Sequence, residues 1–190
     1  MDWPVDDGVR HLVQLLNRPR ARVVVTGQPG SGKTSLCQRV VAHAQANGWQ
    51  VGGVLSAEVR RQGVRAGYDV VDVRTGDTHS FARLRDGGPA AGIPIGRYAI
   101  DPAGLAFARA ALSEAIAANC HLIVIDEVGP LELLRGEGLM PEAVAALRSS
   151  ASVLVIVRRE LLTEFLARFA DLRFHVFDDD ERRARMNNRE

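Results

Sequence analysis

Residues 22–34 read Arg-Val-Val-Val-Thr-Gly-Gln-Pro-Gly-Ser-Gly-Lys-Thr, and this stretch decides the fold. Residues 23–26 are all β-branched, which predicts a short buried strand over 22–26. Two glycines then stand at the first and sixth positions of the segment 27–34, which ends in Lys33 and Thr34. That spacing is typical of a loop that binds phosphate groups. A helical pattern over 33–46 completes the strand, loop and helix that such a loop requires.

The residue types of this segment suit phosphate binding for separate reasons. Glycine permits positive φ angles and lets backbone N–H groups approach phosphate oxygens closely. The first turn of the following helix adds unpaired N–H groups and the positive end of its dipole. We expect the Lys33 ammonium to contact the β- and γ-phosphates of a nucleoside triphosphate and the Thr34 hydroxyl to bind Mg²⁺. The predicted nucleotide-binding residues of this segment are Gly27, Gln28, Pro29, Gly30, Ser31, Gly32, Lys33, Thr34 and Ser35.

A second functional signal is the apolar segment 121–125, which ends in Asp126 and Glu127. The carboxyl ends of parallel strands meet at one edge of a sheet, where open α/β folds bind their ligands. We therefore expect Asp126 to hold Mg²⁺ beside the phosphate loop. Glu127 is then in position to orient and deprotonate an attacking water molecule. Taken alone, two acidic residues after a strand are as often only the polar start of a loop.

Charged residues at two other places are further candidates. The apolar strand 152–157 stops at Arg158, and we expect this strand to lie between the phosphate-loop strand and the Asp126 strand. Arg158 is then a candidate to stabilise charge on the γ-phosphate, although an exposed arginine at a strand end explains the pattern equally well. Glu58, Arg60 and Arg65 surround a predicted turn, where an exposed charged hairpin is the simpler interpretation.

The order of the predicted elements favours one fold class. Apolar strands separated by helices predict a parallel sheet covered on both faces. Residues 50–84 instead read as three consecutive strands without helices. The prediction is a three-layer α/β/α P-loop NTPase fold of the RecA-like kind, with a mainly parallel central sheet and an antiparallel meander addition. We expect one domain over 1–178 with an additional amphipathic helix at 6–17, a mobile loop at 86–94 and a charged flexible tail at 179–190.

The composition narrows the classes of partner. A net charge of +1 gives little support for nucleic acid as a partner, although this interpretation stays open. No apolar run approaches the roughly 18 residues of a membrane span. The two cysteines show neither a metal-ligand spacing nor a disulfide framework, as is common in cytoplasmic proteins. We expect a cytoplasmic monomer whose partner is a nucleoside triphosphate.

Three further stretches resemble one known family, the THEP-type or cancer-related nucleoside-triphosphatases. Gly53-Val-Leu-Ser-Ala-Glu-Val-Arg60, followed by Gly63, Arg65 and Gly67-Tyr-Asp-Val-Val71, resembles the family's Glu-Val-Arg strand and its return. Ile95-Gly-Arg-Tyr98 resembles its Val-Gly-Lys-Tyr, and Asp126-Glu-Val-Gly-Pro-Leu-Glu132 resembles its Asp-Glu-Ile-Gly-Lys-Met-Glu. The order and spacing of these stretches agree over about residues 23–158.

The resemblance implies Mg²⁺-dependent hydrolysis of nucleoside triphosphates to diphosphates and phosphate, with low selectivity among ATP, GTP, CTP and UTP. It also implies that Glu127 is the catalytic base and that Glu58, Arg60 and Arg65 face the substrate. Pro130 stands where the family usually has lysine, so any charge contributed there is absent. The helix predicted at 6–17 is an addition to the usual family pattern.

Two other functions remain open at this point. The first is a small nucleotide or metabolite kinase, in which the loop rich in glycine and proline at 86–94 would act as a lid. The second is a slow NTP-dependent switch whose nucleotide state sets the affinity for a partner. Glu127 favours hydrolysis over the kinase, because a kinase has no need of an activated water, and the switch stays open.

Overall fold

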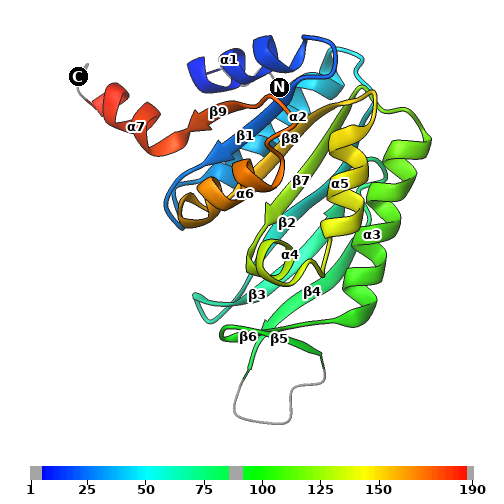
Figure 1. The fold of residues 1–190 in the computed structure, drawn as a ribbon. Helices are drawn as coiled ribbons and strands as arrows, with labels where there is room; N and C mark the ends of the chain where they lie inside the picture. The colour runs from blue at the N-terminus through cyan, green and yellow to red at the C-terminus, as the bar shows by residue number, and fades with distance from the viewer. Residues whose placement is uncertain (1–5, 86–91, 188–190) are drawn as a thin grey trace.

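The computed structural model describes residues 6–85 and 92–187. Nine strands of the described residues form one sheet in the order β5-β6-β4-β3-β2-β7-β8-β1-β9 (Figure 1). The strands are β1 (Arg22–Thr26), β2 (Val51–Arg61), β3 (Val64–Asp72), β4 (Thr78–Leu84), β5 (Ile93–Ile95), β6 (Tyr98–Ile100), β7 (Leu122–Val128), β8 (Ser152–Val157) and β9 (His175–Asp178).

The sheet divides into two halves that meet at β2. Strand β2 pairs with β7 in parallel, and β7–β8, β8–β1 and β1–β9 are parallel as well. On its other side, β2 begins an antiparallel meander through β3, β4, β6 and β5. The predicted fold, a mainly parallel sheet with an antiparallel addition, is confirmed. Strand β8 lies between β1 and β7, as the position of Arg158 required.

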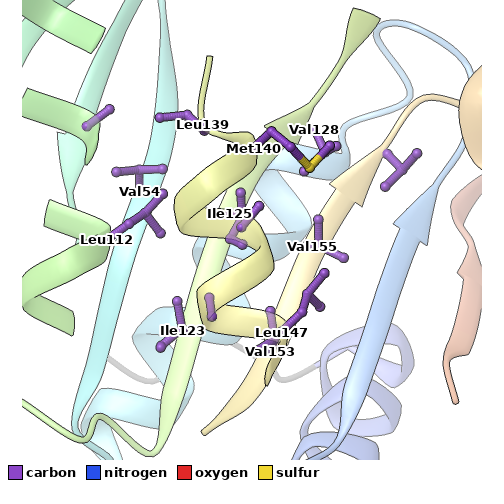
Figure 2. Packing of buried hydrophobic residues seen from close by; sticks show 14 of the residues in the cluster. Val54, Leu112, Ile123, Ile125, Val128, Leu139, Met140, Leu147, Val153 and Val155 are labelled. Atoms are coloured by element: carbon purple, nitrogen blue, oxygen red, sulfur yellow. The ribbon is translucent and has the colours of Figure 1, made fainter. Parts of the chain in front are cut away.

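Helices cover both faces of the parallel half, because its strands are apolar on both sides. The helices are α1 (Asp7–Leu16), α2 (Lys33–Ala46), α3 (Pro102–Ala117), α4 (Pro130–Arg135), α5 (Met140–Arg148), α6 (Leu162–Arg168) and α7 (Asp179–Asn187), with a 3₁₀ turn η1 at Arg159–Leu161. Helices α3 and α5 pack on one face, and Figure 2 shows Met140 of α5 beside Val128 and Leu147 beside Val153. Helices α1 and α2 cover the other face, where Leu12 and Leu36 are fully buried. No described helix is long and apolar enough to cross a bilayer.

The structure differs from the sequence prediction at the C-terminus. The charged stretch from residue 179 was predicted to be a flexible tail, but residues 179–187 form helix α7. The Asp178 carboxylate accepts hydrogen bonds from the N–H groups of Asp180 and Glu181, which caps the first turn. Acidic residues in that turn also suit the positive end of the helix dipole. Of the loop predicted at 86–94, residues 86–91 lie outside the described part of the chain.

Candidate active site

The phosphate loop runs from the end of β1 to the start of α2. Gly27, Gly30 and Gly32 have positive φ angles of 151°, 80° and 93°, which explains the glycines at these positions. The Lys33 ammonium donates hydrogen bonds to the carbonyl oxygens of Gly27 (3.0 Å) and Gln28 (2.8 Å). Lys33 therefore folds back over the loop and closes it into a cradle. The other predicted loop residues, Pro29 and Ser31, lie in this cradle, and Thr34 and Ser35 follow in the first turn of α2.

Two hydroxyl groups at this loop are buried without a hydrogen-bond partner among the described residues. They are the Oγ1 of Thr26, the last residue of β1, and the Oγ of Ser31 within the loop. A buried polar group that lacks a partner costs about 1–3 kcal/mol, so proteins rarely leave one outside a functional site. The pair indicates that the loop is built to receive a polar ligand.

Asp126 lies at the carboxyl end of β7 and is 6% exposed. Its carboxylate accepts a hydrogen bond from the Ser56 N–H at 3.0 Å, which ties β2 to β7. Burial raises the pKa of Asp126 to about 7, the Ser56 N–H and the Thr34 hydroxyl act to lower it, and nearby Glu127 raises it. The buried carboxylate thus meets the hydroxyl of Thr34, although the two residues are far apart in sequence.

The oxygen atoms of Asp126 and Thr34 fit a magnesium ion. Mg²⁺ prefers oxygen ligands and is commonly held by one or two carboxylates together with substrate phosphates and water. A carboxylate whose charge is penalised by burial gains from a cation beside it. The described residues contain no cluster of three or more acidic, histidine or cysteine side chains that would hold a metal without substrate.

Glu127 and Arg158 form an ion pair in which Nε of Arg158 lies 2.5 Å from Oε1 of Glu127. Burial acts to lower the pKa of Arg158, but Glu127 raises it, and the net effect is upward. Arg158 directly follows β8, so the strand order alone brings it beside the end of β7. The structure therefore places both predicted catalytic side chains together at the carboxyl edge of the sheet.

Sequence reasoning missed a contact between the C-terminal segment and the phosphate loop. Asp180 accepts a hydrogen bond from the Gln28 N–H at 2.8 Å. Arg159 pairs with Asp178 and, at 3.1 Å, with Asp180, so it locks that carboxylate in place. The pairing of β9 with β1 creates this contact, and no local pattern in the sequence indicates it.

The predicted group Glu58, Arg60 and Arg65 lies on the β2–β3 hairpin. Glu58 pairs with Arg60 and with Arg65, both at 2.6 Å, and the hydrogen bond from Arg65 lowers the pKa of Glu58. Within the described residues, no hydrogen bond or ion pair joins this group to the phosphate loop or to Asp126. The three side chains therefore pair with one another and not with the phosphate loop or Asp126.

A second missed residue is Glu132, a buried carboxylate in α4. Its two oxygens accept hydrogen bonds from the N–H groups of Gly129 and Leu139, both at 3.0 Å. Burial raises the pKa of Glu132, and these two N–H groups act to lower it. Glu132 thereby fixes the turn that follows Glu127 and joins it to the start of α5. A glutamate three residues after the N-cap is one half of the capping-box pattern; the other half is absent because the N-cap, Gly129, has no side chain.

Comparisons with known proteins identify relatives of this chain. A family model described as NTPase matches residues 22–188. The chain is similar to the nucleoside-triphosphatase THEP1 of Thermococcus kodakarensis, with 37% identity over 150 residues that cover 76% of this chain and 79% of the relative. The protein of the same name from Methanosarcina acetivorans is 31% identical over 174 residues, covering 88% and 95% of the two chains.

Two solved structures are also similar to this chain. One is a human cancer-related nucleoside triphosphatase, with a TM-score of 0.64, 26% identity and coverage of 83% of this chain and 88% of that chain. The other is THEP1 from Aquifex aeolicus, with a TM-score of 0.63, 20% identity and the same coverage of 83% and 88%. At that identity, the second likeness supports the fold alone.

Proposed function

This chain belongs to the NTPase family and is a nucleoside-triphosphatase, and on that premise we propose that Glu127 activates water in the Mg²⁺-dependent hydrolysis of nucleoside triphosphates. One observation carries the proposal: Glu127, next to the buried Asp126 near the end of β7, pairs with Arg158 after β8, the strand that lies beside the phosphate-loop strand β1. A loop that only binds nucleotide has no need of a second carboxylate beside Asp126.

The binding roles follow from the chemistry of each group. The loop N–H groups and the Lys33 ammonium bind the β- and γ-phosphates, and the oxygen atoms of Thr34 and Asp126 hold Mg²⁺. The ion, when bound, neutralises phosphate charge and orients the reacting phosphate. All of these groups act on phosphates and none acts on a base, which supports low selectivity among ATP, GTP, CTP and UTP.

The catalytic roles divide between Glu127 and Arg158. Arg158 holds Glu127 in an ion pair until the negative γ-phosphate competes for the guanidinium. Arg158 then stabilises charge on the γ-phosphate, and Glu127 is free to accept a proton from water. The water oxygen bonds to the γ-phosphorus, the bond to the bridging oxygen of the β-phosphate breaks, and the diphosphate leaves. We also propose that Glu58, Arg60 and Arg65 face the outer side of this site.

The test is the rate of phosphate release with each of the four triphosphates, for the wild type and for Glu127→Gln. Loss of a general base is expected to lower kcat roughly 100- to 10,000-fold. Nucleotide affinity should stay within a few fold, because the amide keeps the shape of the side chain. Glu137→Gln, an exposed glutamate after α4, is the matched control.

Two results would contradict the proposal. Near-normal phosphate release by Glu127→Gln would exclude Glu127 as the base. Transfer of phosphate to an added nucleotide or metabolite, in place of its release, would support the kinase function. Very slow phosphate release that a bound partner does not accelerate would still count as hydrolysis. By contrast, binding of a partner that depends on the nucleotide, without any phosphate release, would support the switch.

A further inference from the structure

Both tyrosines of the chain meet on the meander, although aromatic residues make up only 5% of the sequence. Tyr68 of β3 and Tyr98 of β6 lie with their ring centroids 5.6 Å apart in an edge-to-face arrangement. A guanidinium covers each ring: Arg65 lies 5.5 Å from the centroid of Tyr68 and Arg97 lies 5.2 Å from that of Tyr98. We call these four residues the tyrosine cluster. All four side chains remain partly or fully exposed to solvent.

The tyrosine cluster borders the candidate active site on the side of Glu127. Burial raises the pKa of the Tyr68 phenol, and the Glu127 carboxylate raises it further. Tyr68 in turn contributes to the raised pKa of Arg158. The strand register brings Tyr68 to the same end of the sheet as Glu127: Tyr68 lies opposite Glu58 of β2, and Val54 of β2 lies opposite Ile125, two residues before Glu127. The strand order agrees, because β3 is separated from β7 only by β2.

The strand order also separates the cluster from the nucleoside end of a bound triphosphate. Tyr68 lies four strands from β1, so at a spacing of about 4.8 Å it is about 19 Å from the phosphate-loop strand. With its phosphates in the loop that follows β1, a bound triphosphate leaves the tyrosine cluster, on the other side of β7, to a second molecule.

The chemistry of the cluster matches a nucleobase and its phosphate. Tyrosine rings stack on bases whatever their sequence, and guanidinium groups bind phosphate and stack on the same rings. The Nε of Arg65 is buried and has no hydrogen-bond partner in the described part of the chain. That N–H is a donor for which a phosphate or base oxygen would supply the missing acceptor.

We propose that the tyrosine cluster binds the nucleobase and phosphate of a second molecule, a free nucleotide or a single-stranded nucleic acid, beside the γ-phosphate. The proposal rests on the function proposed above, because it takes the γ-phosphate to face Glu127. Two bases stack on Tyr68 and Tyr98, Arg97 turns from its ring to the phosphate that joins or follows the bases, and Arg65, which stays paired with Glu58, contributes only its Nε–H.

The test uses the full chain saturated with Mg²⁺ and a non-hydrolysable ATP analogue, which keeps probes out of the phosphate loop. The probe is fluorescein-labelled dT10, followed by fluorescence anisotropy, with unlabelled dTMP as competitor. Tyr68→Ala and Tyr98→Ala are each expected to weaken binding roughly 5- to 100-fold through loss of stacking. Tyr68→Phe and Tyr98→Phe should bind as the wild type does, because the ring face carries the contact. Trp49→Ala, which changes an aromatic residue before the amino end of β2, is the control.

The outcomes separate the two sources of the ligand. Displacement of dT10 by dTMP at a similar concentration per nucleotide identifies a free nucleotide. Binding of dT10 alone, falling steeply with added salt, identifies a strand. The proposal is overturned if neither probe binds, if both alanine variants bind normally, or if dT10 and the ATP analogue exclude each other. Normal phosphate release by Glu127→Gln would instead defeat only the function proposed for that residue, since probe binding does not depend on hydrolysis.

Discussion

The parallel and antiparallel halves of the sheet use their strands in different ways. Strands β1 and β8 of the parallel half are buried along their whole length, whereas most residues of β3 and β4 in the meander are partly or fully exposed. In the parallel half, packing occupies the strand side chains, so the groups to which we assign chemistry lie where strands end: at the phosphate loop, at Asp126-Glu127 and at Arg158. In the meander, charged and aromatic side chains lie along the strands themselves.

The two halves also differ in what holds them together. The parallel half buries continuous apolar strands between two layers of helices. The charged groups of the meander pair near solvent, where an ion pair contributes about 0–1 kcal/mol. In the Glu58–Arg60 pair, for example, the side chains are 28% and 61% exposed. The comparison teaches that the parallel half holds the core and the proposed reacting groups, while the meander keeps its polar and aromatic side chains near solvent, where the proposed second ligand would bind.

The largest expected effect on stability comes from adding one methyl group at a packed glycine, compared with the same change at an open one. A Cβ on Gly53 of β2 would lie 2.1 Å from the carbonyl oxygen of Val124, and the φ angle there is 103°. We expect Gly53→Ala to lower the free energy of unfolding by about 4 kcal/mol through overpacking and backbone strain. Gly63→Ala, in the hairpin turn with open space around it, should cost about 1 kcal/mol. Urea denaturation measures both, and equal losses would contradict the difference in packing between the strand position and the open turn.

The next effect concerns arginines at a strand end and along a strand. We expect Arg158→Ala to lower kcat about 100-fold, which corresponds to ~2.7 kcal/mol of transition-state stabilisation. Arg65→Ala should change kcat less than tenfold, because Glu58 already neutralises that guanidinium. Steady-state phosphate release measures both. The control is Arg148→Ala, which changes the last residue of α5, an arginine that pairs with Asp171. A larger loss from Arg65→Ala would place hydrolytic chemistry in the meander.

The difference between the halves also explains what the sequence could predict. The phosphate loop is local in sequence, since strand, glycines and helix fall within one short stretch. Likewise, a continuous apolar run followed by Asp126-Glu127 identifies a buried strand and its functional end. Those features require no knowledge of which strands pair, and the structure confirms the fold that they indicate.

The features that escaped prediction depend on pairings between distant segments. Asp180 reaches Gln28 only because β9 pairs with β1, and its acidic neighbours resemble a solvated tail. Tyr68 and Tyr98 meet because β4 lies between their strands, an order that no periodicity reveals. Strands β5 and β6 are three residues each, too short for an alternating pattern to be recognised.

The third prediction concerns Glu132, a buried polar residue of the parallel half, and its contribution to the free energy of unfolding. Glu132→Gln keeps the size of the side chain but can accept only one of the two backbone hydrogen bonds, from Gly129 and Leu139. The unpaired N–H group is expected to lower the free energy of unfolding by about 2 kcal/mol. Urea denaturation measures the loss, and Glu137→Gln on the adjacent exposed turn should leave stability unchanged. No change in the Glu132 variant would mean that packing alone holds α4 in place.

The smallest expected effect tests the outer layer of the parallel half, where α1 packs on α2. Asp6 caps α1 by accepting the Val9 N–H at 2.9 Å and pairs with Arg39 of α2. Burial acts to raise the pKa of Asp6. The Val9 hydrogen bond and the Arg39 guanidinium together lower it by more than burial raises it, so the net shift is downward.

A depressed carboxyl pKa contributes stability that is present above the ordinary value of about 3.9 and is lost as the pH falls through the folded value. We expect Asp6→Asn, which preserves the cap but removes the charge, to be about 0.5 kcal/mol less stable than the wild type at pH 7. Chemical denaturation as a function of pH should show this difference shrinking below about pH 4. If the difference in stability between the wild type and Asp6→Asn persists in acid, it arises from the helix cap and not from the ion pair. Helix α1 would then pack on α2 by apolar contacts alone, as the rest of the parallel half does.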